Sequence, residues 1–298
     1  MLDGDACRTV LENLPHGVCV VDRSRRILFW NDGAEEITGY HRHEVIGRFC
    51  QDNLLMHCDE NQSVLCGAGC PLANTMLDGR PRDSDVFLRH KDGQRVPVRV
   101  RAVPIRDDFG AIIGSAEFFE ERASRPLDTP PRRTTDRVPL DVITGLPDRR
   151  VTQEAIREAI EEFHATGQPF GVLCIAIDDL ERLRSFDGNQ AVRPLLYAIG
   201  QTVSRSVRPS DTVGRWHDER LVALIASPEA AGLISCAERV QRLVGLTGVP
   251  WWGERLTVTV SMGGAMVRMG DTVESLVGRA EETLEAGMAK HGNAILVV

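Results

Sequence analysis

One segment near the middle of the chain limits its possible folds more than any other feature. Residues 123–139 read ASRPLDTPPRRTTDRVP, with four prolines, four arginines and few side chains to bury. Proline fixes the backbone and removes an N–H donor, so such a segment continues neither a helix nor a central strand. The sequence therefore predicts two domains, residues 10–122 and 140–298, joined by this linker and each of ordinary size.

The balance of charge and hydropathy excludes several classes of protein. The 298 residues carry a net charge of −8, and only two of the 35 basic residues are lysines, so no nucleic-acid partner is expected. No apolar run reaches bilayer-spanning length, and the first residues lack a signal-peptide pattern. We therefore expect a cytoplasmic protein without a membrane partner, whose eight cysteines stay reduced, free or metal-bound.

The first half of the chain alternates strand patterns with short helical ones. Apolar or alternating runs bounded by turn sequences predict strands over residues 17–22, 26–30, 84–89, 95–104 and 111–120. A short helix is expected over 31–40, where an asparagine can cap the start and a glycine the end. This order predicts a five-stranded antiparallel sheet with helices on one face.

Several stretches of the first half resemble a PAS sensor domain. They are LPHGVCVVD at 14–22, ILFWNDGAEEITGY at 27–40, EVIGR at 44–48 and KDGQRVPVRV at 91–100. The similarity covers nearly all of residues 10–122. It implies a pocket for a ligand or cofactor and a tendency to form homodimers.

A cysteine-rich stretch lies between the predicted strands of this half. It contains Cys50, His57, Cys58, Cys66 and Cys70. Thiolates and imidazoles are zinc ligands, and cysteines also hold iron–sulfur clusters, so a metal centre is one interpretation. A redox thiol pair and plain core packing are the others. The stretch also resembles a subgroup of PAS domains attached to cyclases, which implies Cys50, His57, Cys66 and Cys70 as the set, with Cys58 outside it.

The second half predicts an α/β arrangement. Helical spacing is present over residues 151–166, 191–207, 228–247 and 273–290, and strand patterns over 171–177, 211–216, 221–226 and 255–265. Helices alternating with strands indicate a sheet packed by helices, so the whole chain is of the α+β class.

The second half resembles the GGDEF domain, the fold of diguanylate cyclases. The residues that carry the resemblance are DVITGLPDRR at 141–150, Ile177-Asp178, Arg215-Trp216 and TVTVSMG at 257–263. The family makes cyclic di-GMP from two GTP with Mg²⁺. An active cyclase bound to magnesium is therefore one function that the resemblance implies.

The residues at the family's metal-binding and guanine-binding positions instead indicate an inactive site. The first metal-binding aspartate falls on Ala176, and the two guanine contacts fall on Arg184 and Arg193. The five signature positions fall on His217, Asp218, Glu219, Arg220 and Leu221. Alanine cannot coordinate a cation, and Arg220 puts a positive charge where a metal-binding carboxylate belongs. We expect an inactive cyclase site, with metal binding through Asp178 or Asp179 as the alternative.

One binding feature of the family is retained. Arg208 and Asp211 fall where an Arg-x-x-Asp pair forms the inhibitory site for cyclic di-GMP. A guanidinium can bind guanine O6 and N7, and a carboxylate can accept from the N–H groups of the base. The same residues could equally form a solvated turn.

Three functions follow as hypotheses. The first is a PAS sensor of redox state, a metal or a small ligand, coupled to an inactive GGDEF domain that binds cyclic di-GMP, GTP or a protein partner. The second is an active diguanylate cyclase. The third is a structural protein in which both domains serve as dimerisation surfaces.

Overall fold

The computed structural model describes residues 4–298 except 51, 53, 60–62, 67–68, 123–138, 218, 227–228 and 290–291. The chain divides into two compact units, Met1–Arg122 and Ala123–Val298, each with its own sheet. Apart from its last residue, Pro139, the predicted linker lies outside the described residues.

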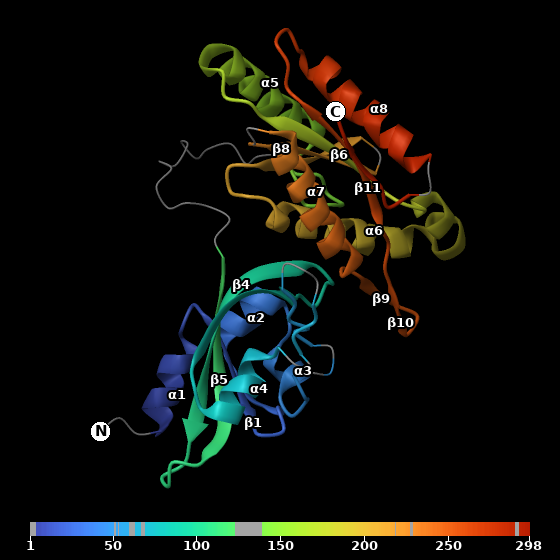
Figure 1. Cartoon of the computed structure of the whole chain (residues 1–298). Helices are drawn as coiled ribbons and strands as arrows, with labels where there is room; N and C mark the ends of the chain where they lie inside the picture. The colour runs from blue at the N-terminus through green and yellow to red at the C-terminus, as the bar shows by residue number, and fades with distance from the viewer. Residues whose placement is uncertain are drawn as a thin grey trace. The chain divides into compact units, whose positions relative to one another are not determined.

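The N-terminal unit is a five-stranded antiparallel sheet in the order β2-β1-β5-β4-β3 (Figure 1). Its strands are β1 (Gly17–Asp22), β2 (Ile27–Trp30), β3 (Arg82–Arg89), β4 (Arg95–Arg106) and β5 (Ile112–Glu121). Its helices are α1 (Gly4–Glu12), α2 (Asp32–Thr38), α3 (Arg42–Val45) and α4 (Pro71–Asp78). The predicted sheet is confirmed, and the sequence analysis gave no bounds for α1, α3 and α4.

The turn residues explain the ends of α2. Asn31 caps its start, because its side chain accepts a hydrogen bond from the N–H of Ala34 at 3.0 Å. Gly39 ends it in the left-handed conformation at φ 73°, which favours glycine. The predicted helix over 31–40 is therefore confirmed as α2, with Asn31 and Gly39 as its caps and Tyr40 beyond its end.

The C-terminal unit has a second five-stranded sheet, in the order β12-β11-β6-β8-β7. Only the β11–β12 pair is parallel. The strands are β6 (Gly171–Ile177), β7 (Thr212–His217), β8 (Arg220–Ile225), β11 (Val260–Met266) and β12 (Ile295–Val297), and β9 (Val249–Trp251) and β10 (Glu254–Leu256) form a separate hairpin. The helices are α5 (Arg149–Thr166), α6 (Leu180–Ser206), α7 (Ala230–Gly245) and α8 (Val273–Met288).

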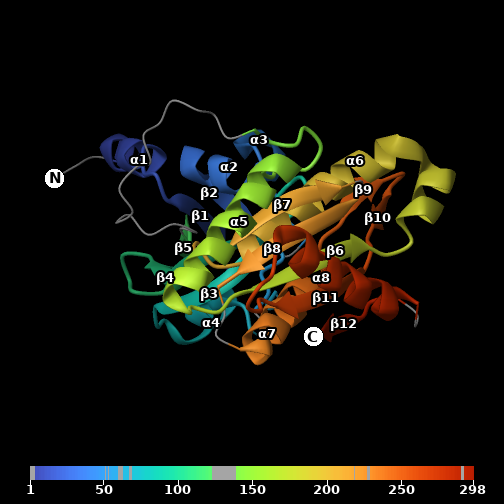
Figure 2. The same ribbon diagram turned by 90° about the horizontal axis from the view of Figure 1, so that it is seen from above.

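Helices cover both faces of this sheet, as Figure 2 shows. α5 and α8 pack on one face, where Ile156, Val222 and Leu284 belong to one apolar cluster. α6 and α7 pack on the other face, over a second cluster that includes Ile175 and Leu195. β6 is buried along its whole length, as expected for a central strand between two helical layers.

Two predicted elements of this unit are wrong in extent. The helix expected over 191–207 begins earlier, at Leu180, because a second helical stretch precedes it across a break at Gly188 (φ 73°). The strand expected over 255–265 is two strands. β10 pairs with β9 and β11 pairs with β6, so the chain changes partners at residues 257–259.

Candidate functional site

A small cavity in the N-terminal unit gathers the predicted cysteine and histidine set. Cys50, His57, Cys66 and Cys70 all line it. Arg25, Leu55 and Leu72 complete its wall. Its volume of about 10 Å³ corresponds to roughly one water molecule.

Hydrogen bonds of the main chain hold the cysteine-bearing turns in place. The Cys50 N–H donates to the carbonyl of Arg25 at 3.0 Å, and Arg25 Nη1 donates to the carbonyl of Cys66 at 2.8 Å. The Leu65 N–H donates to the carbonyl of His57 at 2.8 Å, and Cys70 directly precedes α4. Arg25 thus connects two of the turns that carry thiols.

Cys58 faces a different environment. Its backbone N–H and carbonyl pair with Phe87 of β3, at 2.9 and 2.8 Å. Burial raises the pKa of its thiol, and the neighbouring charges are those of Arg95 and Asp59. The structure therefore separates Cys58 from the four residues around the cavity.

Glu117 is a buried carboxyl group that the sequence analysis missed. It lies on β5 opposite Cys19 of β1 and is 0% exposed. Its Oε2 is 3.8 Å from Nε2 of His57, too far for a hydrogen bond, and among the described residues neither carboxyl oxygen nor this nitrogen has a partner. Burial raises the pKa of Glu117 to about 8 and, as the main cause, lowers the pKa of His57 to about 4. Both groups are therefore mainly neutral at pH 7.

The donor atoms around the cavity do not yet form a coordination sphere. Within the described residues, no three histidine, cysteine, aspartate or glutamate side chains are grouped closely enough to hold an ion as they stand. Burial is the main cause that raises the pKa of Cys50 and of Cys66. The predicted zinc or iron–sulfur centre thus stays a prediction, while the gathering of its four side chains is observed.

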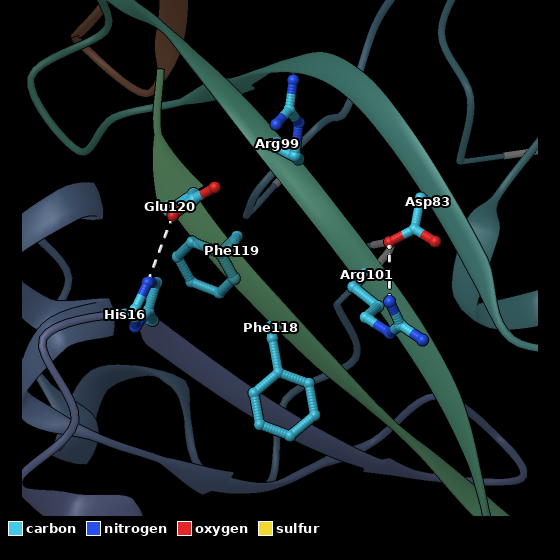
Figure 3. Close-up of a pocket in the computed structure, with 7 residues that line it drawn as sticks. All are labelled: His16, Asp83, Arg99, Arg101, Phe118, Phe119 and Glu120. Carbon is cyan, nitrogen blue, oxygen red and sulfur yellow. Dashed lines mark hydrogen bonds and ion pairs between the residues drawn. The ribbon is translucent and has the colours of Figure 1, made fainter. Parts of the chain in front are cut away.

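A second hollow, of about 250 Å³, lies against the sheet of this unit (Figure 3). Its lining residues are His16, Asp83, Arg99, Arg101, Phe118, Phe119 and Glu120. His16 pairs with Glu120 at 3.1 Å and Arg101 with Asp83 at 3.5 Å, so charges within its wall are already matched. Exposed pairs of this kind contribute little to stability.

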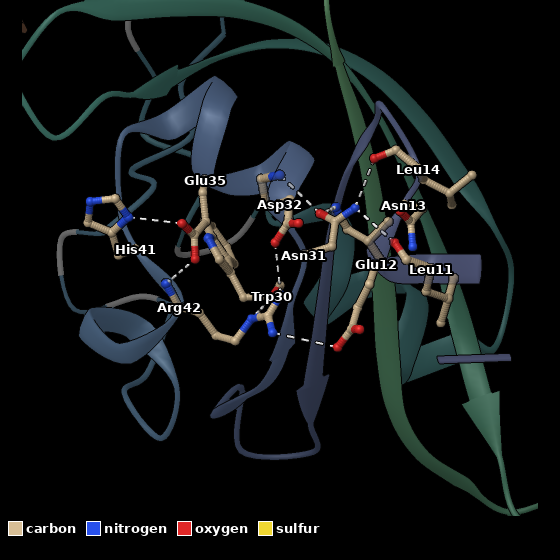
Figure 4. Close-up of polar contacts among 12 residues, drawn as sticks. Leu11, Glu12, Asn13, Leu14, Trp30, Asn31, Asp32, Glu35, His41 and Arg42 are labelled. Carbon is tan, nitrogen blue, oxygen red and sulfur yellow. Dashed lines mark hydrogen bonds and ion pairs between the residues drawn. The ribbon is translucent and has the colours of Figure 1, made fainter. Parts of the chain in front are cut away.

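A polar network connects α1 to the segment that follows β2 (Figure 4). The side-chain amide of Asn31 donates to the carbonyls of Leu11 and His16, at 3.0 and 2.9 Å. Arg42 donates to the carbonyl of Trp30 at 2.8 Å and pairs with Glu12 at 3.5 Å. Because these are interior backbone contacts and bridging ion pairs, we assign the network a structural role.

In the C-terminal unit, the cyclase-like positions border a pocket of about 330 Å³. Its lining residues are Ala176, Ile177, Asp179, Leu180, Glu181, Glu219, Arg220 and Met288. Ala176 lies in β6, directly opposite Arg220 in β8. Ala176, which stands where the family has a metal-binding aspartate, therefore lies beside an arginine, Arg220, on the neighbouring strand.

Asp178 is held by three hydrogen bonds. Thr259 Oγ1 donates to its Oδ2 at 2.6 Å, Ser261 Oγ to its Oδ1 at 2.7 Å, and the N–H of Asn293 to its Oδ2 at 2.8 Å. Asp178 is buried and does not line the pocket, whereas Asp179 is exposed and does. Both carboxyl oxygens of Asp178 thus connect β6 to the segments around β11 and β12.

Contacts between oppositely charged groups involve three of the five signature positions, His217, Glu219 and Arg220. Arg184 contacts Glu219, and Arg220 contacts Glu285 of α8. His217 Nε2 lies 2.7 Å from Glu281 Oε1, also on α8. Leu221 is buried in β8, Arg193 is exposed on α6, and Asp218 lies outside the described residues. The structure therefore assembles a charged network where the family resemblance places its nucleotide and metal contacts.

A separate pocket of about 290 Å³ contains both residues of the predicted cyclic di-GMP site. Arg208 and Asp211 line it together with Ile225, Ala226, Gly232, Ser235, Cys236 and Arg239. The Asp211 carboxylate accepts from the backbone N–H of Arg208 at 2.9 Å and of Ala226 at 3.0 Å. Arg239 donates through Nε to the carbonyl of Ser206 at 2.8 Å. Asp211 thus stabilises the turn at residues 208–211, and Arg208 and Arg239 border the same pocket.

The two residues that sequence reasoning missed left different signals. Glu117 occupies an inward position of β5 between buried Ser115 and Phe119, where a strand pattern calls for an apolar side chain. Arg239 lies on α7, 31 residues after Arg208, and nothing in the local pattern marks it. Tertiary packing brings it to the pocket, because α7 packs beside α6, and Arg239 donates to the carbonyl of Ser206 at the end of α6.

Among the described residues, no helix combines the length and the apolar character needed to cross a bilayer.

Comparisons with known proteins identify both units. A family model described as "Diguanylate cyclase, GGDEF domain" matches residues 138–294, and one described as a PAS domain matches residues 15–122. The response regulator PleD of Caulobacter vibrioides is 25% identical over 264 residues, covering 77% of this chain and 57% of PleD. The diguanylate cyclase DosC of Escherichia coli is 26% identical over 159 residues, covering 53% of this chain and 35% of DosC.

Solved structures agree on the C-terminal fold. The diguanylate cyclase SiaD of Pseudomonas aeruginosa, solved with its activator SiaC, has a TM-score of 0.52 and 26% identity, covering 53% of this chain and 61% of SiaD. The GGDEF domain of DgcB from Caulobacter crescentus, solved with c-di-GMP, has a TM-score of 0.52 and 19% identity, covering 55% and 96%. The chain belongs to the GGDEF family, and with a PAS domain before its GGDEF domain it is a signalling protein related to diguanylate cyclases.

Proposed function

We propose that the GGDEF domain of this protein binds cyclic di-GMP without making it, and that its PAS domain supplies the sensory input. The observation that carries the first part is the charged network at the cyclase positions. An alanine stands at position 176, and the arginines at 184 and 220 pair with Glu219 and Glu285.

Phosphoryl transfer in this family needs divalent ions held by carboxylates. Mg²⁺ requires oxygen ligands in near-octahedral geometry, so replacing one ligand by a methyl group and another by a cation is severe. Asp178 is engaged by three hydrogen bonds and is a poor substitute. Glu219 is neutralised by Arg184.

The pocket at Arg208 supports binding rather than catalysis. Arg208 and Arg239 border a hollow of about 290 Å³, and Asp211 in the same wall is fixed by hydrogen bonds from the backbone N–H groups of Arg208 and Ala226. Guanidinium groups suit both the acceptor edge of guanine and a phosphodiester. Among the described residues, the pocket at Arg208 has no ion pairs like those at the cyclase positions.

Isothermal titration calorimetry with cyclic di-GMP tests the binding proposal. We expect the full chain to bind, and Arg208→Ala and Arg239→Ala to weaken binding roughly 10-fold or more, since each removes a charged hydrogen-bond donor. Arg157→Ala is the matched control, because this exposed arginine of α5 lies outside the pocket lining. No heat from the unmodified protein would refute the proposal.

A second candidate, an active diguanylate cyclase, rests on one observation. Asp179, Glu181 and Glu219 all line the pocket at the cyclase positions, so three carboxylates border it. Product formation from GTP decides between the candidates. A homodimer, a GTP or protein partner, and a cytoplasmic location stay predictions from the sequence.

A further inference from the structure

We propose that the small cavity of the PAS domain binds one metal ion of the zinc type, with Cys50, His57, Cys66 and Cys70 as ligands and Glu117 as the residue that positions His57. The proposal rests on the proposed function and names a metal ion as the ligand that the PAS domain senses. It concerns the N-terminal unit alone, so it stands or falls independently of the cyclic di-GMP pocket.

The size of the cavity limits what can occupy it. About 10 Å³ holds roughly one water molecule, whereas organic ligands fill pockets of several hundred cubic ångströms. A single ion fits such a space. An iron–sulfur cluster, which contains several iron and sulfur atoms, would need the surrounding side chains to move much further apart.

The lining residues supply a complete donor set for one ion. Three thiols and one imidazole are the ligands of a common tetrahedral zinc site. The four residues lie in turns or at a helix start, outside the interior of any helix or strand. Among the described residues, no three donors are yet grouped around one point, so binding an ion requires the four side chains to move closer together. Small backbone adjustments in these turns would allow that movement.

Two polar groups of this core lack hydrogen-bond partners. Among the described residues, both carboxyl oxygens of Glu117 and Nε2 of His57 are buried without one. Leaving such groups unpaired destabilises a fold. Arg25, in the cavity wall, donates through Nη1 to a backbone carbonyl. An ion bound to the other ring nitrogen of His57 would fix the imidazole with its Nε2–H free to donate to Glu117.

Glu117 has the geometry of a positioning residue rather than a ligand. It does not line the cavity, but its Oε2 is 3.8 Å from Nε2 of His57, which does. A metal-bound histidine typically donates its other ring N–H to a carboxylate, which fixes the ring and raises its basicity. A shift of about 1 Å would convert this contact into such a hydrogen bond and leave the other ring nitrogen for the ion.

Elemental analysis of the full chain, purified without chelators or metal-affinity resin, gives the first test. We expect about one zinc ion per chain, falling roughly 10-fold in Cys66→Ser and Cys70→Ser. Cys58→Ser is the matched control, since this buried cysteine lies 8 residues before Cys66 but outside the cavity, and it should keep its zinc. A brown iron–sulfur chromophore, or equal loss in the control, would overturn the proposal.

Titration of the metal-stripped protein with Co²⁺ gives a test that needs no variant. We expect the intense visible bands of a tetrahedral thiolate site, saturating at one ion per chain. The absence of these bands in protein with a folded circular dichroism spectrum would refute the site.

The role of Glu117 is tested in the same titration. Glu117→Gln should keep the shape of the Co²⁺ spectrum but raise its dissociation constant roughly 10- to 100-fold. Glu120→Gln, an exposed change on the same strand, should leave it unaltered. An unchanged constant in Glu117→Gln would remove Glu117 from the site, and a changed spectral shape would make it a direct ligand.

Discussion

Asp178 shows how a residue beside a former metal position can be used for structure. Its carboxylate accepts from the hydroxyls of Thr259 and Ser261 and from the N–H of Asn293. The neighbouring Asp179 has a backbone φ of 55° and is exposed. Two adjacent aspartates therefore have different roles, which depend on which side of the strand end they face.

Replacing each aspartate by asparagine tests this assignment. Asp178→Asn should lower the free energy of unfolding by about 2 kcal/mol, because it removes a charged acceptor from buried donors. Asp179→Asn should change it by less than about 0.5 kcal/mol, since asparagine tolerates the left-handed conformation. Urea unfolding at pH 7 measures both, and equal effects would contradict the assignment.

Asn31 offers a second prediction at this scale. Its amide donates to the carbonyls of Leu11 in α1 and of His16 after it. Its Oδ1 accepts from the N–H groups of Val18 and Ala34, at 2.7 and 3.0 Å. Asn31→Asp keeps the acceptor and loses the donors, so we expect a loss of about 2 kcal/mol in unfolding free energy. Asp32→Asn, an exposed neighbour, is the control in the same urea experiment.

Single residues could be predicted from the sequence where their chemistry is visible in the chain order. Ala176 and the cavity set of Cys50, His57, Cys66 and Cys70 needed only spacing and family resemblance. The pairing of Arg184 with Glu219 depends on contacts between segments far apart in the chain, and so does the place of Glu117 beside His57. Sequence patterns report the face of an element, not its partner across the core.

At the scale of elements, a partly buried ion pair and a backbone hydrogen bond help to hold α8 against the end of β11. Asp271, which precedes the helix, contacts both Nη atoms of Arg279, at 2.5 and 2.8 Å. Arg279 Nη2 also donates to the carbonyl of Met266 at the end of β11, at 2.8 Å. Burial acts to raise the pKa of Asp271, but hydrogen bonds from Arg279, the backbone of Arg268 and Ser275 outweigh it and lower the pKa.

This pair predicts a pH dependence with a definite sign. A carboxyl group with a lowered native pKa stabilises the fold above its unfolded value of about 3.9, and this contribution is lost as the pH falls through the native value. Asp271→Asn should therefore cost about 1–2 kcal/mol at pH 7 and progressively less below pH 4. Urea unfolding at pH 7 and below pH 4 measures this cost, with Glu282→Gln as an exposed control on the same helix. A cost that persists unchanged in acid would contradict the ion-pair origin.

Periodicity predicted most elements because each buries one face. It failed at Gly188, where two helical stretches meet, and at residues 257–259, where a continuous strand pattern changes partners. It also gave no strand for β12, three residues long, whose place depends on pairing with β11. Short elements that exist through tertiary pairing have too few residues for a pattern.

At the scale of the molecule, the two units carry separate candidate sites. The thiol-lined cavity lies in the N-terminal unit and the arginine-lined pocket in the C-terminal one. The proline-rich composition of residues 123–139 predicts that no continuous helix connects them. We therefore expect each unit to respond to its own ligand.

Metal removal tests that expectation. Treating the protein with a zinc chelator should lower the unfolding temperature of the PAS domain, because an ion that binds only the folded state stabilises it. The GGDEF domain should unfold at the same temperature as before, and cyclic di-GMP should raise only that transition. Differential scanning calorimetry with each treatment measures this, and a single transition shifted by both would contradict separate response.

Loss of catalysis with retention of the fold is the main feature that we propose for the GGDEF domain. Chromatographic detection of cyclic di-GMP tests it, after long incubation of the full chain with GTP and Mg²⁺, and separately with Mn²⁺. We expect no product above a protein-free control, because position 176 has no carboxylate and Arg184 and Arg220 contact Glu219 and Glu285. Product that accumulates in proportion to protein, and disappears in Glu219→Gln, would show that the domain is an active cyclase.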